Sequence, residues 1–210
     1  MLKFVTFEGG EGSGKSTIVG LVSEKLSEIF PELPILKTRE PGGTETAEQV
    51  RSVIMTHDTD AITEAYLFAA ARAAHLREKV IPFLKTGGLV LCDRYIDSNL
   101  VYQGIVRGIP CEKIFRINEE AIIEDDMRVM PGITFFLDVK PEVGLARINK
   151  AGRTTNRFDN KEIEFHHQVY DGYKKLTEMY PERFVVVDAN RKPDEIVRDV
   201  VALITEKIGL

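Results

Sequence analysis

The sequence predicts an α/β fold in which a doubly wound, five-stranded parallel sheet is flanked by helices. Short apolar runs rich in β-branched residues alternate with longer stretches of helical periodicity. Near-continuous apolar runs are typical of strands covered on both faces, and their alternation with helices predicts βαβ units. The expected strands span residues 2–7, 33–38, 89–92, 133–138 and 184–188. The expected helices span residues 15–29, 44–55, 61–85, 98–124, 141–150, 161–180 and 193–207.

Composition indicates one ordinary globular domain over residues 1–210. Hydrophobic residues make up 43% of the chain and charged residues 29%, which excludes a disordered chain. A formal charge of -5 argues against a nucleic-acid partner. The sequence contains neither a signal peptide nor an apolar stretch of the ~18 residues that span a bilayer, so we expect a cytoplasmic protein without a membrane partner. Its two cysteines, Cys92 and Cys111, have no spacing typical of a disulfide framework or zinc site.

A glycine-rich segment directly after the first expected strand matches the phosphate-binding pattern G-x-x-x-x-G-K-[ST] at residues 9–16. Glycines let backbone N–H groups converge on phosphate oxygens, and the following helix adds its N-terminal dipole. Lys15 is placed to bridge the β- and γ-phosphates of ATP, and Ser16 to join the shell of a Mg²⁺ ion. The alternative is a turn that binds nothing, and a dinucleotide-binding loop fails on glycine spacing. The expected ATP contacts are Gly9, Gly10, Glu11, Gly12, Ser13, Gly14, Lys15, Ser16 and Thr17.

A second charged pair, Asp93 and Arg94, ends the third expected strand. The carboxyl end of a core strand lies beside the phosphate loop, so Asp93 is expected to organise Mg²⁺ together with Ser16. Arg94 would then contact a phosphate in the same crevice. The alternative is a helix cap at Asp93 and a surface ion pair at Arg94. Neither the N-K-x-D nor the D-x-x-G motif of GTPases is present, which leaves the small-molecule kinases.

Four blocks of sequence, in this order and spacing, resemble the bacterial thymidylate kinases. They read F-E-G-G-E-G-S-G-K-S at 7–16, T-R-E-P-G-G-T at 38–44, L-F-A-A-A-R at 67–72 and D-R-Y-I-D-S-N-L-V-Y-Q-G at 93–104. The resemblance runs over nearly the whole chain. It implies transfer of the γ-phosphate of Mg²⁺-bound ATP to dTMP, which gives dTDP and ADP in dTTP biosynthesis. It also implies a homodimer.

The resemblance assigns the acceptor base to side chains from two helices. Phe68 would stack on the thymine ring and Arg72, four residues later on the same helical face, would donate to its O4. Asn99 and Gln103 are also four apart, and their amides both donate and accept at a pyrimidine edge. Tyr102 would crowd the ribose 2′ position. The alternatives are that Phe68 belongs to the core, with Arg72 its solvated neighbour, and that the amides cap and pack.

The resemblance also implies the catalytic charges, of which Lys15 and Arg94 are already named. Glu11 would reach the acceptor 3′-hydroxyl, while Arg39 and Arg51 would hold the acceptor phosphate. The phosphate loop has no arginine, so a lid at about 150–160 would supply Arg153 and Arg157 to the ATP phosphates. A solvated basic loop is the alternative for the lid, and surface charges are the alternative for the other arginines.

Two other functions stay open at this point. One is a kinase for another nucleoside monophosphate or for a nucleoside, which the base-contacting side chains argue against. The other is a nucleotide-binding regulatory module without turnover, which the intact Lys15, Asp93 and Arg94 argue against.

Overall fold

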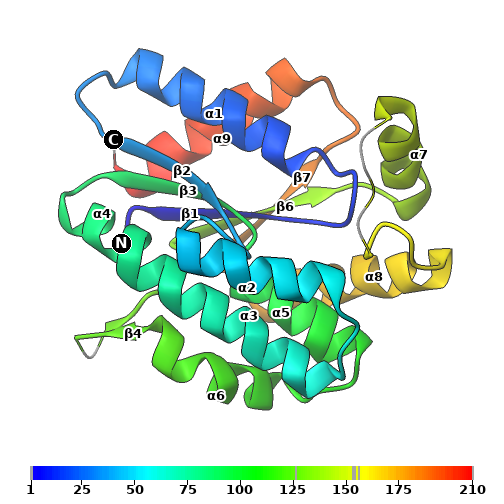
Figure 1. The fold of residues 1–210 in the computed structure, drawn as a ribbon. Helices are drawn as coiled ribbons and strands as arrows, with labels where there is room; N and C mark the ends of the chain where they lie inside the picture. The colour runs from blue at the N-terminus through cyan, green and yellow to red at the C-terminus, as the bar shows by residue number, and fades with distance from the viewer. Residues whose placement is uncertain (1, 126, 153–154, 156, 210) are drawn as a thin grey trace.

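The computed structural model describes residues 2–125, 127–152, 155 and 157–209. Within this part of the chain, five parallel strands form the main sheet in the order β2-β3-β1-β6-β7 (Figure 1). The strands are β1 (Phe4–Glu8), β2 (Ile35–Arg39), β3 (Leu89–Asp93), β6 (Ile133–Asp138) and β7 (Phe184–Asp188). The predicted fold class and all five predicted strands are confirmed, with small shifts at the strand ends.

Helices cover both faces of the sheet (Figure 1). The longer ones are α1 (Lys15–Ile29), α2 (Glu45–Thr56), α3 (Ala61–His75), α6 (Cys111–Ile122), α7 (Pro141–Ala151), α8 (Ile163–Met179) and α9 (Pro193–Ile208). Side chains alternate across each strand, so Val5 and Phe7 join the core beneath α1 and α9, whereas Phe4 joins the core on the opposite face. No helix in the described ranges is both long and apolar enough to cross a bilayer.

The predicted helix over residues 61–85 is helical throughout but not regular. After α3, the segment Leu76–Val80 (η1) has π-helical hydrogen bonding, and α4 (Ile81–Lys85) completes the stretch. Pro82 lies in the first turn of α4 and has no N–H to donate to the preceding turn. A local change of helical register is therefore tolerated here.

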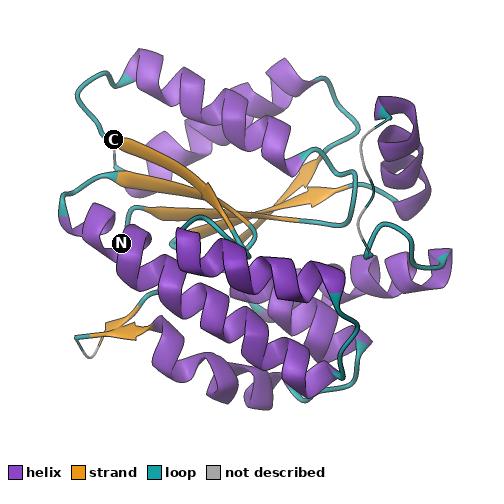
Figure 2. Cartoon of the chain, in the orientation of Figure 1, coloured by secondary structure: helices purple, strands orange, loops and turns teal. Residues whose placement is uncertain are grey.

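The prediction of one helix over residues 98–124 is wrong. The structure has α5 (Ile96–Asn99) and the π-helical segment η2 (Leu100–Val106), followed by a turn and then by α6. Gly108 in that turn has a left-handed φ of 78°, and Pro110 lacks the N–H that a continuing helix needs. A short hairpin, β4 (Ile123–Glu124) with β5 (Met127–Arg128), then lies apart from the main sheet (Figure 2).

Candidate active site

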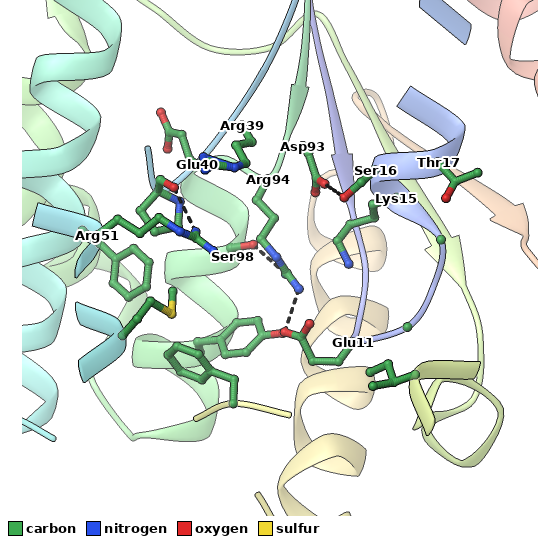
Figure 3. Close-up of a pocket in the computed structure, with 18 of the residues that line it drawn as sticks. Glu11, Lys15, Ser16, Thr17, Arg39, Glu40, Arg51, Asp93, Arg94 and Ser98 are labelled. Carbon is green, nitrogen blue, oxygen red and sulfur yellow. Dashed lines mark hydrogen bonds and ion pairs between the residues drawn. The ribbon is translucent and has the colours of Figure 1, made fainter. Parts of the chain in front are cut away.

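A cavity of about 590 Å³ opens at the carboxyl edge of the sheet, where β1, β2 and β3 end. It brings together residues from the phosphate loop, from the ends of β2 and β3, and from α1, α2, α3, α5, η2 and α7. Figure 3 shows many of their side chains. The residues predicted from sequence that line it are Glu11, Gly12, Gly14, Lys15, Ser16, Thr17, Arg39, Arg51, Phe68, Asp93, Arg94, Tyr102 and Gln103. The predicted phosphate contacts thus share one cavity with three of the predicted base and ribose contacts, Phe68, Tyr102 and Gln103.

The phosphate loop is packed tightly against α7. Gly12 has a φ of 71°, and a Cβ at this position would overlap the carbonyl oxygen of Gly144. Gly14 has a φ of 89° and caps the start of α1. A left-handed backbone favours glycine at both positions, and at Gly12 the close approach of Gly144 also excludes a side chain. The loop therefore presents its backbone N–H groups at a helix N-terminus, a geometry that binds phosphate.

Lys15 folds back over this loop. Its Nζ donates to the carbonyl oxygens of Gly9, at 3.0 Å, and Gly10, at 2.8 Å, and to Ser13 Oγ at 3.1 Å. Burial, followed by the charge of Arg94, lowers the pKa of Lys15 from 10.5 to about 8. A buried cation of this kind gains from the approach of phosphate oxygens, which replace the hydration it lost.

Ser16 and Asp93 supply two oxygen atoms suited to a hard cation. Ser16 Oγ donates to Asp93 Oδ2 at 2.5 Å, which joins the start of α1 to the end of β3 (Figure 3). Among the described residues there is no group of three or more acidic, histidine or cysteine side chains that could hold a metal ion. A Mg²⁺ ion at this hydroxyl and carboxylate would therefore complete its shell with phosphate oxygens and water, as Mg²⁺ does with nucleotides.

Arg94 occupies the centre of the cavity from a strained backbone position with a φ of 71°. Its Nη2 donates to Glu11 Oε1 at 2.9 Å (Figure 3), and its Nη1 donates to Ser98 Oγ at 3.1 Å and to the Tyr173 hydroxyl at 3.0 Å. The Tyr102 hydroxyl donates to the same Glu11 oxygen at 3.1 Å. Arg94 is therefore pre-positioned, since each of these contacts restricts its guanidinium.

Glu8 lies beneath Arg94 and was missed by the sequence analysis. It is fully buried and accepts from Tyr95 N at 2.7 Å, Ser98 Oγ at 2.7 Å and the Tyr173 hydroxyl at 2.8 Å. Burial, followed by the charge of Asp97, raises the pKa of Glu8 from 4.5 to about 7, although its hydrogen bonds oppose the rise. The signals in the sequence are its place at the end of the first strand and in the first of the four family-like blocks, and neither indicates a role.

Two further arginines line the cavity beside Arg94. Arg39 pairs with the Glu48 carboxylate through two hydrogen bonds of 2.7 and 3.1 Å, and Arg51 Nη1 donates to Pro41 O at 3.0 Å. Burial, with the nearby charge of Arg39, lowers the pKa of Arg51. Like charges that converge in this way against an acidic background form a site that favours an anion.

The far end of the cavity is apolar and aromatic. Phe68, Met55 and Phe158 line it, and the Tyr102 ring meets Phe158 edge-to-face at 5.7 Å. Gln103 lines the same end of the cavity. Arg72 and Asn99 do not line it; they are buried behind the lining side chains, 2% and 1% exposed.

Arg72 is held rigidly in its buried position. Its Nε donates to Glu40 Oε2 at 2.8 Å, and its Nη1 donates to Asn118 Oδ1. His75 Nδ1 lies 3.0 Å from the other Glu40 oxygen, which fixes that carboxylate in turn. Glu40 and Asn118 were also missed, because they lie 32 and 46 residues from Arg72 and nothing local connects them.

The structure describes only one of the two predicted lid arginines, Arg157. Arg153 lies outside the described residues. Arg157 ion-pairs with Glu64 and, at 3.2 Å, with Asp58, while its guanidinium lies 4.4 Å from the centre of the Phe158 ring. In this structure Arg157 therefore contacts the apolar, aromatic end of the cavity, where the base contacts are predicted, and this end is called the base end below. Arg147, on α7, lines the cavity next to the phosphate loop and was missed.

A phosphate loop on a helix N-terminus, a facing carboxylate and several converging arginines define a P-loop phosphotransferase for small molecules. The comparison with known families is specific: residues 7–200 match the family model described as thymidylate kinase. The chain is 48% identical to a thymidylate kinase of Shouchella clausii, over 94% of this chain and 92% of that one. It is 47% identical to a thymidylate kinase of Halalkalibacterium halodurans, over 99% of this chain and 98% of that one.

A solved structure agrees with these relatives. The crystal structure of thymidylate kinase from Ehrlichia chaffeensis superposes with a TM-score of 0.76 at 32% identity, and covers 96% of this chain and 97% of that one. The chain belongs to the thymidylate kinase family. It is accordingly an enzyme of the nucleoside monophosphate kinase class.

Proposed function

We propose that this chain transfers the γ-phosphoryl group of ATP to the phosphate of dTMP, which gives ADP and dTDP for dTTP biosynthesis. The observation that carries the proposal is the single cavity that joins a phosphate loop at one end to an aromatic, amide-bearing end at the other. The family match over residues 7–200 supports dTMP as the acceptor.

Transfer proceeds in line. An oxygen of the dTMP phosphate attacks the γ-phosphorus, the bond from that phosphorus to the β–γ bridging oxygen breaks, and ADP leaves. The acceptor is already an anion at neutral pH, so no strong base is needed, and catalysis is mostly positioning and charge neutralisation. Lys15 and Arg94 offset the charge on the transferring group, and Arg39 with Arg51 holds the acceptor phosphate.

When bound with ATP, Mg²⁺ would supply positive charge that offsets the charge of the phosphate oxygens. Ser16 and Asp93 would hold it directly or through water, and their 2.5 Å hydrogen bond supports this pairing. Arg153 and Arg157 of the lid would close over the nucleotide and exclude water.

The acceptor nucleoside lies at the other end. Phe68 stacks on the thymine ring and Gln103 contacts the N3–H edge, since both line the cavity. Arg72 would donate to O4 and Asn99 would contact the N3–H edge from their buried positions beside this lining. Tyr102 packs against the ribose at its 2′ position. Glu11, which already holds Arg94, accepts from the 3′-hydroxyl.

An acceptor panel tests this function. ADP release is measured with ATP and each of dTMP, dUMP, dCMP, dAMP, dGMP and thymidine. We expect dTMP to give the highest kcat/KM, and omission of Mg²⁺ to abolish turnover. Preference for any acceptor other than dTMP would contradict the assignment, and ADP release that no acceptor stimulates would contradict phosphoryl transfer itself.

We also propose a homodimer, which the family resemblance implies. Val53 on α2 and Tyr66 on α3 are large apolar side chains, 42% and 58% exposed, on two helices that pack against each other. A second copy would cover them. Analytical ultracentrifugation should give a dimer for the wild type and a monomer for Tyr66→Glu; a monomeric wild type would contradict the proposal.

A further inference from the structure

A chain of buried amides lies behind the base end of the cavity and connects α6 to α3. Asn118 Nδ2 donates to Asn99 Oδ1 at 2.9 Å, Asn99 Nδ2 donates to Gln103 Oε1 at 2.7 Å, and Gln103 Nε2 donates to Glu64 Oε1 at 2.6 Å. All four side chains are at most 1% exposed. We call Asn118, Asn99 and Gln103 the amide relay. Every hydrogen bond in it runs in the same direction.

This direction is imposed at both ends of the relay. A side-chain amide can turn by half a rotation and exchange its donor for its acceptor, so its orientation depends on its partners. Arg72 only donates, and its Nη1 faces Asn118 Oδ1 and, at 3.4 Å, Asn99 Oδ1. The Glu64 carboxylate only accepts, so the Gln103 atom that faces it must be nitrogen. Reversing any amide between these ends would set two donors or two acceptors against each other.

Glu64 is supported as a buried carboxylate. It ion-pairs with Arg107, at 3.1 Å, and with Arg157. A carboxylate that is 1% exposed needs such partners to offset its lost hydration. Glu64 itself does not line the cavity described above, whereas Gln103, which it orients, does.

We propose that Glu64 and Asn118 are positioning residues that set the base specificity of the acceptor site. The inference rests on the proposed function. With the relay held in this direction, Gln103 Oε1 keeps one lone pair for an N3–H donor. The hydrogen bonds described for Arg72 use Nε and Nη1, which leaves Nη2 for a 4-carbonyl acceptor.

This pattern fits thymine and uracil, which carry N3–H and O4. It opposes cytosine, whose N3 accepts and whose 4-amino group donates. Stacking on Phe68 cannot make this distinction, because pyrimidine rings of similar size stack alike. Discrimination against cytosine therefore depends on the polar groups, and a polar site that leaves a buried group unpaired rejects the wrong ligand strongly.

The test is the ratio of kcat/KM for dTMP to that for dCMP in Glu64→Gln. The new amide can donate as well as accept, so it satisfies either orientation of Gln103, and the restraint at this end of the relay is lost while the one from Arg72 remains. We expect the ratio to fall by about tenfold, the equivalent of one hydrogen bond. The ratio for dTMP to dUMP should stay unchanged, since both bases present the same edge to the relay. Arg107→Ala, which removes a partner of Glu64 but keeps its carboxylate, should retain the wild-type ratio for dTMP to dCMP.

Asn118→Asp tests the opposite end, and it keeps the proposal falsifiable if Glu64→Gln does not fold. The new carboxylate cannot donate to Asn99, so the restraint at this end is lost while the one from Glu64 remains, and the same fall in the dTMP to dCMP ratio is expected. A ratio within about twofold of wild type in a variant with unaltered ATP affinity would overturn the relay. A wild type that does not phosphorylate dTMP would instead overturn the proposed function, so the two failures are distinguishable.

Discussion

The two ends of the cavity differ in how the chain builds them. At the phosphate end, most groups come from one contiguous loop and the end of one strand, and the loop backbone offers N–H groups suited to phosphate. At the base end, the contacts join α3, η2 and α6, and Arg72 is held by residues 32 and 46 positions away. The comparison teaches that the proposed phosphate site is encoded locally, whereas the proposed base site depends on tertiary packing. Substitutions at the two ends test this separation.

The largest effect is expected at the phosphate end. Lys15→Ala should lower kcat by about a thousandfold, because it removes a buried positive charge from the transferring phosphate. The fold should persist, as judged by circular dichroism. Lys25→Ala, on the exposed side of the same helix, is the matched control and should keep full activity. Normal turnover in a folded Lys15→Ala protein would refute the proposed mechanism.

The raised pKa of Glu8, which lies beneath the phosphate end, predicts that the free energy of unfolding of the protein depends on pH. Its pKa is raised to about 7 in the folded chain, so the folded state binds a proton that the unfolded state releases near pH 4.5. The stabilising contribution is complete below about pH 4.5 and is lost as the pH rises through about 7. It amounts to on the order of 3 kcal/mol.

Urea unfolding at about pH 5 and about pH 8.5 measures this contribution. The free energy of unfolding of Glu8→Gln should fall less over this interval than that of the wild type, by about 2–3 kcal/mol. Glu28→Gln, at an exposed position, should behave as wild type. Identical pH dependence in Glu8→Gln and wild type would show that the buried carboxyl does not take up a proton on folding.

A smaller effect on kcat is expected for a substitution of Arg157. It tests whether this residue acts at the phosphate end or at the base end. In the structure it pairs with Glu64 at the base end, so a role at the ATP phosphates requires that pair to break. Arg157→Ala should lower kcat by about tenfold and change dTMP affinity less, as for an interaction made in the transition state. Arg198→Ala, on the exposed surface of α9, is the control. An unchanged kcat with weakened dTMP binding would assign Arg157 to the base end.

Local patterns account for what could be predicted from the sequence. The five strands follow from apolar runs, and Lys15, Ser16 and Asp93 follow from a motif and its position after a strand. The break at Gly108 was missed because helical periodicity continues on both sides of it. The positions of Glu8, Glu40 and Asn118 depend on which helices pack together, and periodicity within one segment carries no information on that.

Isothermal titration of ATP and dTMP against Phe68→Ala and Arg72→Ala tests the central claim most directly. Loss of a stacking partner costs ~1–3 kcal/mol by analogy with nucleic-acid stacking, and loss of a charged donor costs a similar amount. Both variants should therefore bind dTMP about tenfold to a hundredfold more weakly and ATP as wild type does. Phe115→Ala, a partly buried phenylalanine on α6 outside the cavity lining, controls for general loosening of the core. Equal losses for both ligands, or unchanged dTMP affinity, would contradict a separate base end and the choice of thymidylate as acceptor.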